Sequence, residues 1–180
     1  MNVWELKSGP LNAFAPLVIT LEDRSRMALL FADGQAKAWP QAPSVGFLVD
    51  KRTKGLPRAD VPMLVNGALA LTQRAKEALG PLLSRFGQLV PLDCKDQPVW
   101  YFNVTTVIDG LDRQSSVLRE DGSIAKEAFF ASKVPLQATV FKDPAKLRSR
   151  IYVNQAAKDE IDKIVGEHGL TGLEIIEPGT

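Results

Sequence analysis

Asp109 and Asp112 are the side chains whose spacing suggests chemistry most directly, because they flank Gly110-Leu111 in a short loop after an aromatic, apolar stretch. Paired carboxylates can hold a divalent metal or serve as acid and base in a hydrolysis. Calcium loops place further acidic residues at alternating positions, a pattern that this loop lacks. The same side chains can cap a turn by accepting hydrogen bonds from backbone amides, or they can contact a partner. The spacing leaves these uses open.

Other nucleophiles and bases are few. His168 is the only histidine and stands where a helix should end, a place where the helix dipole favours imidazolium. Cys94 is the single cysteine, with Lys95 as its only adjacent cation, which indicates an inert thiol. The sequence has no Gly-x-Ser-x-Gly elbow and no glycine-rich phosphate loop. We therefore expect no enzyme, no catalytic residue, no cofactor and no metal, with a small-molecule hydrolase using Asp109 and Asp112 as the alternative.

Several polar and aromatic residues are candidates for contact with a partner protein. Trp39 precedes Pro40 in an expected loop, and exposed tryptophans often anchor interfaces. Basic residues gather at 51–54 and again at 142–150. The alternative at each place is a solvated loop or, for Trp39, packing over the edge of the core. The predicted partner-binding residues are Trp39, Arg52, Asp109, Asp112, Arg113 and Lys142.

Composition narrows the class of protein. The 180 residues carry 22 Lys and Arg against 21 Asp and Glu, so there is no overall basic field that would indicate nucleic acid as a partner. No uncharged apolar run is long enough to span a membrane, and the first residues lack the pattern of a signal peptide. We expect a cytoplasmic protein that binds neither nucleic acid nor membrane, and a homo-oligomer stays open.

Two segments have the periodicity of amphipathic helices. Thr72 is a suitable N-cap for a helix with apolar residues at 75, 78, 79, 82, 83 and 86, in which Pro81 should produce a kink or a break. Asn154 is a suitable N-cap for a second helix that Gly169 ends. The sequence therefore predicts two main helices.

The remaining apolar runs favour strands, and no segment repeats at a fixed period. Val99-Trp100-Tyr101-Phe102 is typical of a central strand, and Asp121-Gly122 between two such runs indicates a hairpin. Strands are predicted at 3–7, 17–21, 27–31, 46–49, 89–92, 99–107, 115–119, 124–130, 136–141, 150–153 and 173–176. The predicted fold class is α+β: a mixed, mostly antiparallel sheet with two main helices, in which a β-rich N-terminal section (1–60) packs on the main domain (61–180).

Five short motifs follow one another in an order that resembles a known family. They are the helix pattern from Thr72 to Leu83 followed by Gly87-Gln88-Leu89-Val90-Pro91-Leu92; Tyr101-Phe102-Asn103-Val104; Asp109-Gly110-Leu111-Asp112 with Ser115; Ala138-Thr139-Val140-Phe141; and Leu170-Thr171-Gly172-Leu173-Glu174. Over about residues 60–177 the chain resembles a large family of immunity proteins from bacterial polymorphic-toxin systems, formerly catalogued as a domain of unknown function.

The resemblance implies a cytosolic inhibitor made beside a toxin, such as an effector of type VI secretion, that neutralises this toxin by stoichiometric binding. Asn103 and Asp112 would then tie strand ends together, and variable loops would carry specificity for the toxin. The departures from the family pattern are Pro81 inside the helix and a chain with few acidic clusters. A non-catalytic scaffold or adaptor is a further alternative.

Overall fold

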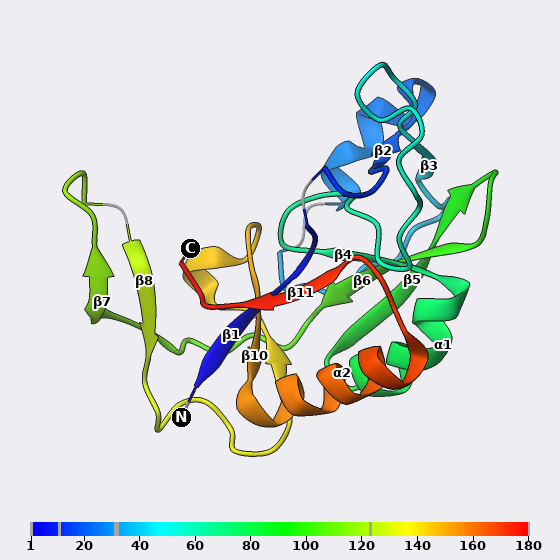
Figure 1. Cartoon of the computed structure of the whole chain (residues 1–180). Coiled ribbons are helices and arrows are strands. Elements are labelled where there is room, and N and C mark those ends of the chain that lie inside the picture. Colours follow the sequence, from blue (N-terminus) through cyan, green and yellow to red (C-terminus); the bar gives the residue numbers. More distant parts are fainter. Residues whose placement is uncertain (1, 11, 31–32, 123, 180) are drawn as a thin grey trace.

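A computed structural model describes residues 2–10, 12–30, 33–122 and 124–179 (Figure 1). It has the α+β class that the sequence predicts, with α1 (Gln73–Leu83), α2 (Gln155–His168) and the 3-10 segments η1 (Leu21–Leu30) and η2 (Pro144–Lys146). The strands are β1 (Val3–Ser8), β2 (Leu17–Ile19), β3 (Ser44–Phe47), β4 (Leu69–Thr72), β5 (Gly87–Cys94), β6 (Val99–Val104), β7 (Leu111–Leu118), β8 (Ile124–Phe129), β9 (Val140–Phe141), β10 (Ile151–Asn154) and β11 (Leu173–Ile176).

Three sheets are formed by these strands. An antiparallel sheet has the order β11-β1-β10-β9, so the first strand of the chain lies between two of the last. A second sheet has the order β2-β3-β5-β6-β4, and only its β3–β5 pair is parallel. Strands β7 and β8 form a separate hairpin. The N-terminal section expected at 1–60 is therefore divided: β1 joins the C-terminal strands, while β2, η1 and β3 form a lobe at the top of Figure 1.

The two helical halves of the scaffold have the same topology. In one half β6 lies between β4 and β5, and helix α1 connects these two outer strands. In the other half β1 lies between β10 and β11, which α2 connects. The pairing registers also correspond, because Leu71 faces Trp100 where Val153 faces Trp4. The structure thus contains an internal repeat that the sequence did not reveal.

Side-chain contacts recur in both halves at a spacing of 82 residues along the helices. Thr72 caps α1 by accepting from the Ala75 amide, as Asn154 caps α2 by accepting from the Ala157 amide. A lysine lies over a tryptophan in each half, with Lys76 4.8 Å from the Trp100 ring centre and Lys158 5.3 Å from that of Trp4. In each helix the first glutamine also donates to the carboxylate four residues later, Gln73 to Glu77 and Gln155 to Asp159. The agreement extends to individual side chains.

The apolar faces of α1 and α2 meet in one large core between the two sheets. Leu79 and Ile161, which the repeat makes equivalent, are both fully buried there together with Phe102 and Leu6. A second cluster lies on the other face of β6, under the N-terminal lobe, and includes Tyr101 and Leu30. Burial of this extent in a chain of this size supplies the main stabilising free energy of the fold.

Some local expectations differ from the structure. A strand was expected at 27–31, but the chain forms η1 up to Leu30, and residue 31 lies outside the described residues. The strand expected at 136–141 is reduced to β9. Helix α1 runs through Pro81 without a break, because this proline stands in the last turn and only one amide donor is lost there. The two differences in the predicted strands arise because short apolar runs fit both strand and turn.

Candidate protein-interaction site

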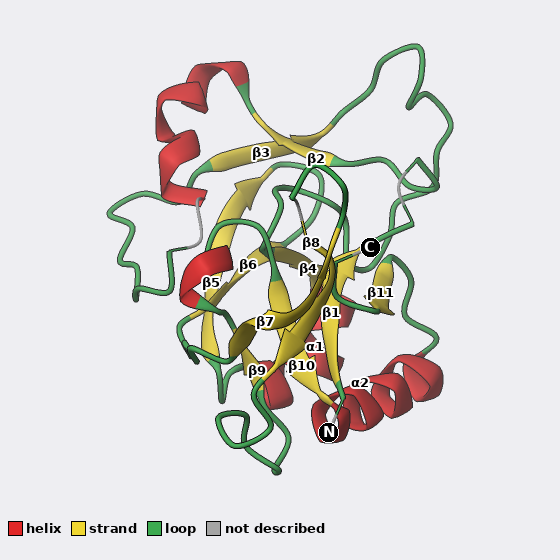
Figure 2. Cartoon of the chain, turned by 90° about the vertical axis from the view of Figure 1, so that its left-hand side faces the viewer, coloured by secondary structure: helices red, strands yellow, loops and turns green. Residues whose placement is uncertain are grey.

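The hairpin of β7 and β8, which we call the arm (Leu111–Phe129), projects from the two-sheet scaffold as a separate two-stranded sheet (Figure 1). Figure 1 shows it at the left, separated from the N-terminal lobe, and Figure 2 shows it in front of β1 and β10. The Asp121-Gly122 turn expected from the sequence lies at its tip, where Gly122 has the left-handed φ of 79°. The arm is thus an extended loop element on a rigid support, as many binding elements are.

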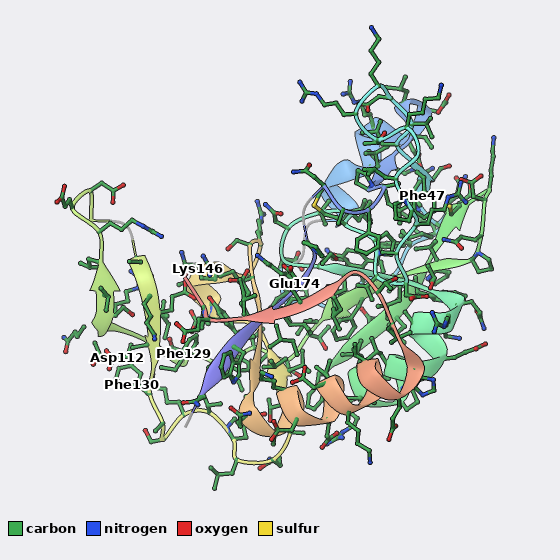
Figure 3. The ribbon with its side chains drawn as sticks, viewed as in Figure 1. Phe47, Asp112, Phe129, Phe130, Lys146 and Glu174 are labelled. Atoms are coloured by element: carbon green, nitrogen blue, oxygen red, sulfur yellow. The ribbon has the colours of Figure 1, made fainter. Side chains whose placement is uncertain are left out.

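Aromatic packing fastens the base of the arm. The Phe129 ring meets Tyr152 edge-on at 5.0 Å between ring centres and Phe141 at 6.2 Å. In Figure 3 Phe129 lies between the arm and the body, whereas Phe130 and Asp112 lie on the outer side of the arm. Side chains alternate in direction at the end of β8, so Phe129 faces the scaffold and Phe130, which directly follows the strand, faces solvent.

A buried polar network joins the arm to the scaffold beside these rings. The Tyr152 hydroxyl donates to Glu127 Oε2 at 2.7 Å, and the Arg150 guanidinium lies 3.7 Å from the same oxygen and binds Glu5. Burial is the main cause that raises the pKa of Glu5, although Arg150 opposes it. Burial likewise raises the pKa of the Tyr152 hydroxyl, which therefore stays a donor at neutral pH. The network fixes β8 against β1 and β10.

Asp143 holds the loop from which the arm begins. Its Oδ2 accepts from the amides of Gly110 and Leu111 at 2.9 and 2.8 Å, and its Oδ1 accepts from Ala145 at 2.9 Å. The carboxylate is buried and serves three backbone donors at once. It thereby places Asp109 and Asp112 at the mouth of a groove.

This base groove, of about 630 Å³, brings together three of the residues predicted to contact a partner: Asp109, Asp112 and Arg113. Phe130 and Lys133 also line it. Asp112 accepts from the amides of Gln114 and Ser115 and from the Ser115 hydroxyl, which chiefly lowers the pKa of its carboxyl. Asp112 therefore caps a turn, which is one of the roles that the sequence left open for it.

Asp109 has a different environment from Asp112. Its exposed carboxylate pairs with Lys133 at 3.0 Å. The groove is open, and two carboxylates with separate partners on its rim can take part in surface ion pairs with an incoming chain.

A second groove, of about 490 Å³, lies between the arm and the scaffold. Strand residues from the arm and from β1 line it, together with the C-terminal Glu177 and Pro178. Trp4 and Val117 add apolar surface on its opposite walls. The arm therefore has a hollow along its inner side and another at its base, which gives it two surfaces for a partner chain to follow.

Lys142 has a structural position that differs from the exposed loop expected for it. Its side chain is fully buried, and its ammonium donates to the carbonyls of Gly67, Leu147 (2.7 Å) and Arg150 (3.2 Å). Burial lowers the pKa of Lys142 to about 7. In this structure Lys142 thus binds the backbone and does not reach a partner, which corrects its assignment to an exposed basic loop.

Trp39 and Arg52 lie in the N-terminal lobe, away from the arm. Trp39 is half-buried and packs on Tyr101 with ring centres 5.7 Å apart, so it covers the core edge. Arg52 is exposed on a turn next to a small cavity. The structure thus brings Asp109, Asp112 and Arg113 together and separates them from Trp39 and Arg52.

The motif residues that carry the family resemblance make scaffold contacts. Asn103 is buried and donates to the Gln35 carbonyl at 2.7 Å and to Gln88 Oε1 at 3.1 Å. Thr171 donates to Asp60 Oδ2 through its amide and its hydroxyl, at 2.9 and 3.0 Å. These contacts hold loops to strand and helix ends, which is a structural role.

Comparisons with known proteins give no assignment: no protein-family model matches the chain, and no curated protein matches it. Within the described ranges, no group of three or more His, Cys, Asp or Glu side chains is placed to hold a metal. Among the same residues, no helix combines the length and the apolar character that crossing a membrane requires.

Proposed function

We propose that this protein is an immunity protein that binds a cognate bacterial toxin in a one-to-one complex and thereby neutralises it in the cytoplasm. The proposal rests first on the five ordered motifs and on their resemblance to the immunity family. A protein of this kind needs a stable scaffold and a complementary surface, and it needs no catalytic group.

The arm is the observation that carries the proposal. Val117 and Leu118 near its tip are each 56% exposed, and Phe130 at its base is 39% exposed. Val117 and Leu118 are thus exposed on the arm itself, and Phe130 lies in the base groove together with Asp109 and Arg113. Exposed apolar side chains with charged residues nearby are typical of a protein-docking surface. The grooves beside the arm are open, whereas small-molecule sites are usually enclosed and apolar with converging polar groups.

The hydrolase alternative would use Asp109 and Asp112 in the base groove. Asp112 accepts hydrogen bonds from Ser115 and so caps a turn, and Asp109 forms a surface ion pair with Lys133. The arrangement therefore favours the binding protein over the hydrolase.

The test is co-expression with the protein encoded directly upstream, with host growth and co-purification as readouts. We expect restored growth and a stable one-to-one complex, with an interface of about 1,200–2,000 Å². The double variant Val117→Asp/Leu118→Asp should lose rescue, because it places two charges in the buried part of the interface.

Leu21→Asp is the matched control. Leu21 is equally apolar and 76% exposed, but it begins η1 in the N-terminal lobe, so this variant should rescue growth as the wild type does. Absence of a complex, or equal rescue by the arm variant, would contradict the proposal for that pair of proteins.

A further inference from the structure

A tight turn at residues 50–55, at the top of the N-terminal lobe in Figure 1, carries three exposed cations: Lys51, Arg52 and Lys54. Their side chains make no hydrogen bond or ion pair with any residue that the structure describes. Elsewhere many surface cations are paired, for instance Arg58 with Asp96 at 2.9 Å. The turn is therefore a local concentration of positive charge in a chain that is almost neutral overall.

The backbone of this turn is held rigidly. Asp50 Oδ1 accepts from the amides of Arg52 and Thr53 at 2.8 and 2.9 Å, and the Lys54 amide donates to the Asp50 carbonyl at 2.9 Å. The Thr53 hydroxyl donates to the Leu48 carbonyl at 2.8 Å. Because Asp50 bonds to the turn backbone, its carboxylate forms no ion pair with the three cations, and the turn fixes the backbone positions from which their side chains extend.

A small cavity lies directly beside Arg52. It has a volume of about 110 Å³, and Arg52 and Thr53 line it together with the apolar side chains of Phe14, Leu56 and Met63. An apolar cavity of about 150 Å³ accepts benzene, so this one has room for a branched aliphatic side chain. A single arginine beside a largely apolar cavity is complementary to an apolar side chain with a carboxylate next to it.

The cavity has one further feature, which is the backbone of Asn12 at its edge. This residue has φ of 66°, in the left-handed region that asparagine adopts more readily than most other residues with a side chain.

We propose that the 50–55 turn and its cavity form a second docking surface, which binds an acidic segment of a partner protein. An aliphatic side chain of the segment enters the cavity, and a neighbouring carboxylate pairs with Arg52. Lys51 and Lys54 meet further acidic residues at the rim. The apolar cavity favours a peptide over a nucleic acid, whose phosphates would use the cations and leave the cavity empty. This surface is independent of the arm and of the proposed toxin.

Methyl NMR of the intact chain tests this surface with a defined probe, the peptide acetyl-Glu-Leu-Glu-Glu-amide. We expect saturable shifts of the Met63 and Leu56 methyl signals, and at least tenfold weaker binding to Arg52→Glu. Replacing the peptide leucine by serine should weaken binding by a similar factor. Lys163→Glu makes the same charge change on an exposed lysine of α2 and should bind as the wild type does.

Three outcomes would overturn the proposal. They are the absence of methyl shifts at millimolar peptide, equal binding by Arg52→Glu, and stronger shifts with the single-stranded oligonucleotide dT10 than with the peptide. An amide spectrum of Arg52→Glu that matches the wild type outside the lobe verifies that the variant is folded. No toxin is present in this assay, so its result is separate from that of the co-expression experiment.

Discussion

At the scale of single residues, Lys142 has the least ordinary environment in the structure. Its ammonium is surrounded by three backbone carbonyls, one of which belongs to Gly67, whose φ of 69° directs that carbonyl to it. An added Cβ at Gly67 would meet the backbone of Arg148 at 2.8 Å, so only glycine fits here. The lysine thereby connects the loop before β4 with the loop before β10.

The lowered pKa of Lys142 gives a prediction on stability and pH. Its pKa is about 7 in the folded protein and 10.5 in its ordinary state, so between these values the unfolded chain holds a proton that the folded chain lacks. The free energy of unfolding should therefore rise with pH in this window, by up to about 1.4 kcal/mol per pH unit relative to Lys142→Met. Urea unfolding of both proteins at pH 6, 7, 8 and 9 measures the difference.

Lys163→Met is the control for this measurement, because Lys163 is exposed and should give no such pH dependence. A difference between wild type and Lys142→Met that stays flat or falls from pH 7 to 9 would contradict the assignment.

At the scale of elements, Asp143 should determine the order of the arm. Asp143→Ala removes the acceptor of two buried amide donors, Gly110 and Leu111, and of the exposed Ala145 amide. Unpaired buried donors cost about 1–3 kcal/mol each when they find no new partner. We expect a loss of about 2–4 kcal/mol in stability and faster amide hydrogen exchange at Gly110 and Leu111. Exchange measured by mass spectrometry checks this.

The comparison for this prediction is Asp109→Ala, which removes only a surface ion pair and should change stability by less than about 1 kcal/mol. Equal exchange at Gly110 in both variants would show that Asp143 does not hold the loop.

Features that depend on neighbouring residues were predictable at this scale. Thr72, Asn154 and Gly169 end or begin helices where expected, and Asp121-Gly122 turns the arm. Those signals are local, because a cap or a tight turn is formed within four residues.

Features that depend on distant segments were not predictable. The acceptors of Lys142 come from residues 67, 147 and 150, and the position of Arg52 next to Phe14 requires the chain to return over some 40 residues. Of the residues predicted to contact a partner, the structure groups around one groove those that are close in sequence, Asp109, Asp112 and Arg113.

At the scale of the whole molecule, the internal repeat allows a circular permutant to be designed. In one half β5 continues directly into β6 through residues 95–98, while in the other half β11 and its neighbour β1 contain the two chain ends. A permutant can be made by joining those ends with about eight Gly and Ser residues and opening the chain after Lys95. In this permutant β11 continues into β1, and the new chain ends lie between β5 and β6. We expect a folded protein with the wild-type circular dichroism spectrum.

A permutant opened between Tyr101 and Phe102 is the control, because both residues are buried in the central strand β6, and this protein should not fold. If the permutant opened after Lys95 is also unfolded, the two halves are not equivalent in the way that their topology implies.

The repeat also divides the chain into a duplicated scaffold and the segments outside it. The two copies of one three-strand unit with its helix contact each other through α1 and α2. Outside the two copies are two connections, residues 9–68 and 105–150. The first contains the 50–55 turn and the second contains the arm. Both proposed docking surfaces thus lie mainly on segments outside the duplicated scaffold, so these segments can be exchanged by design for others while the contacts of the scaffold stay the same.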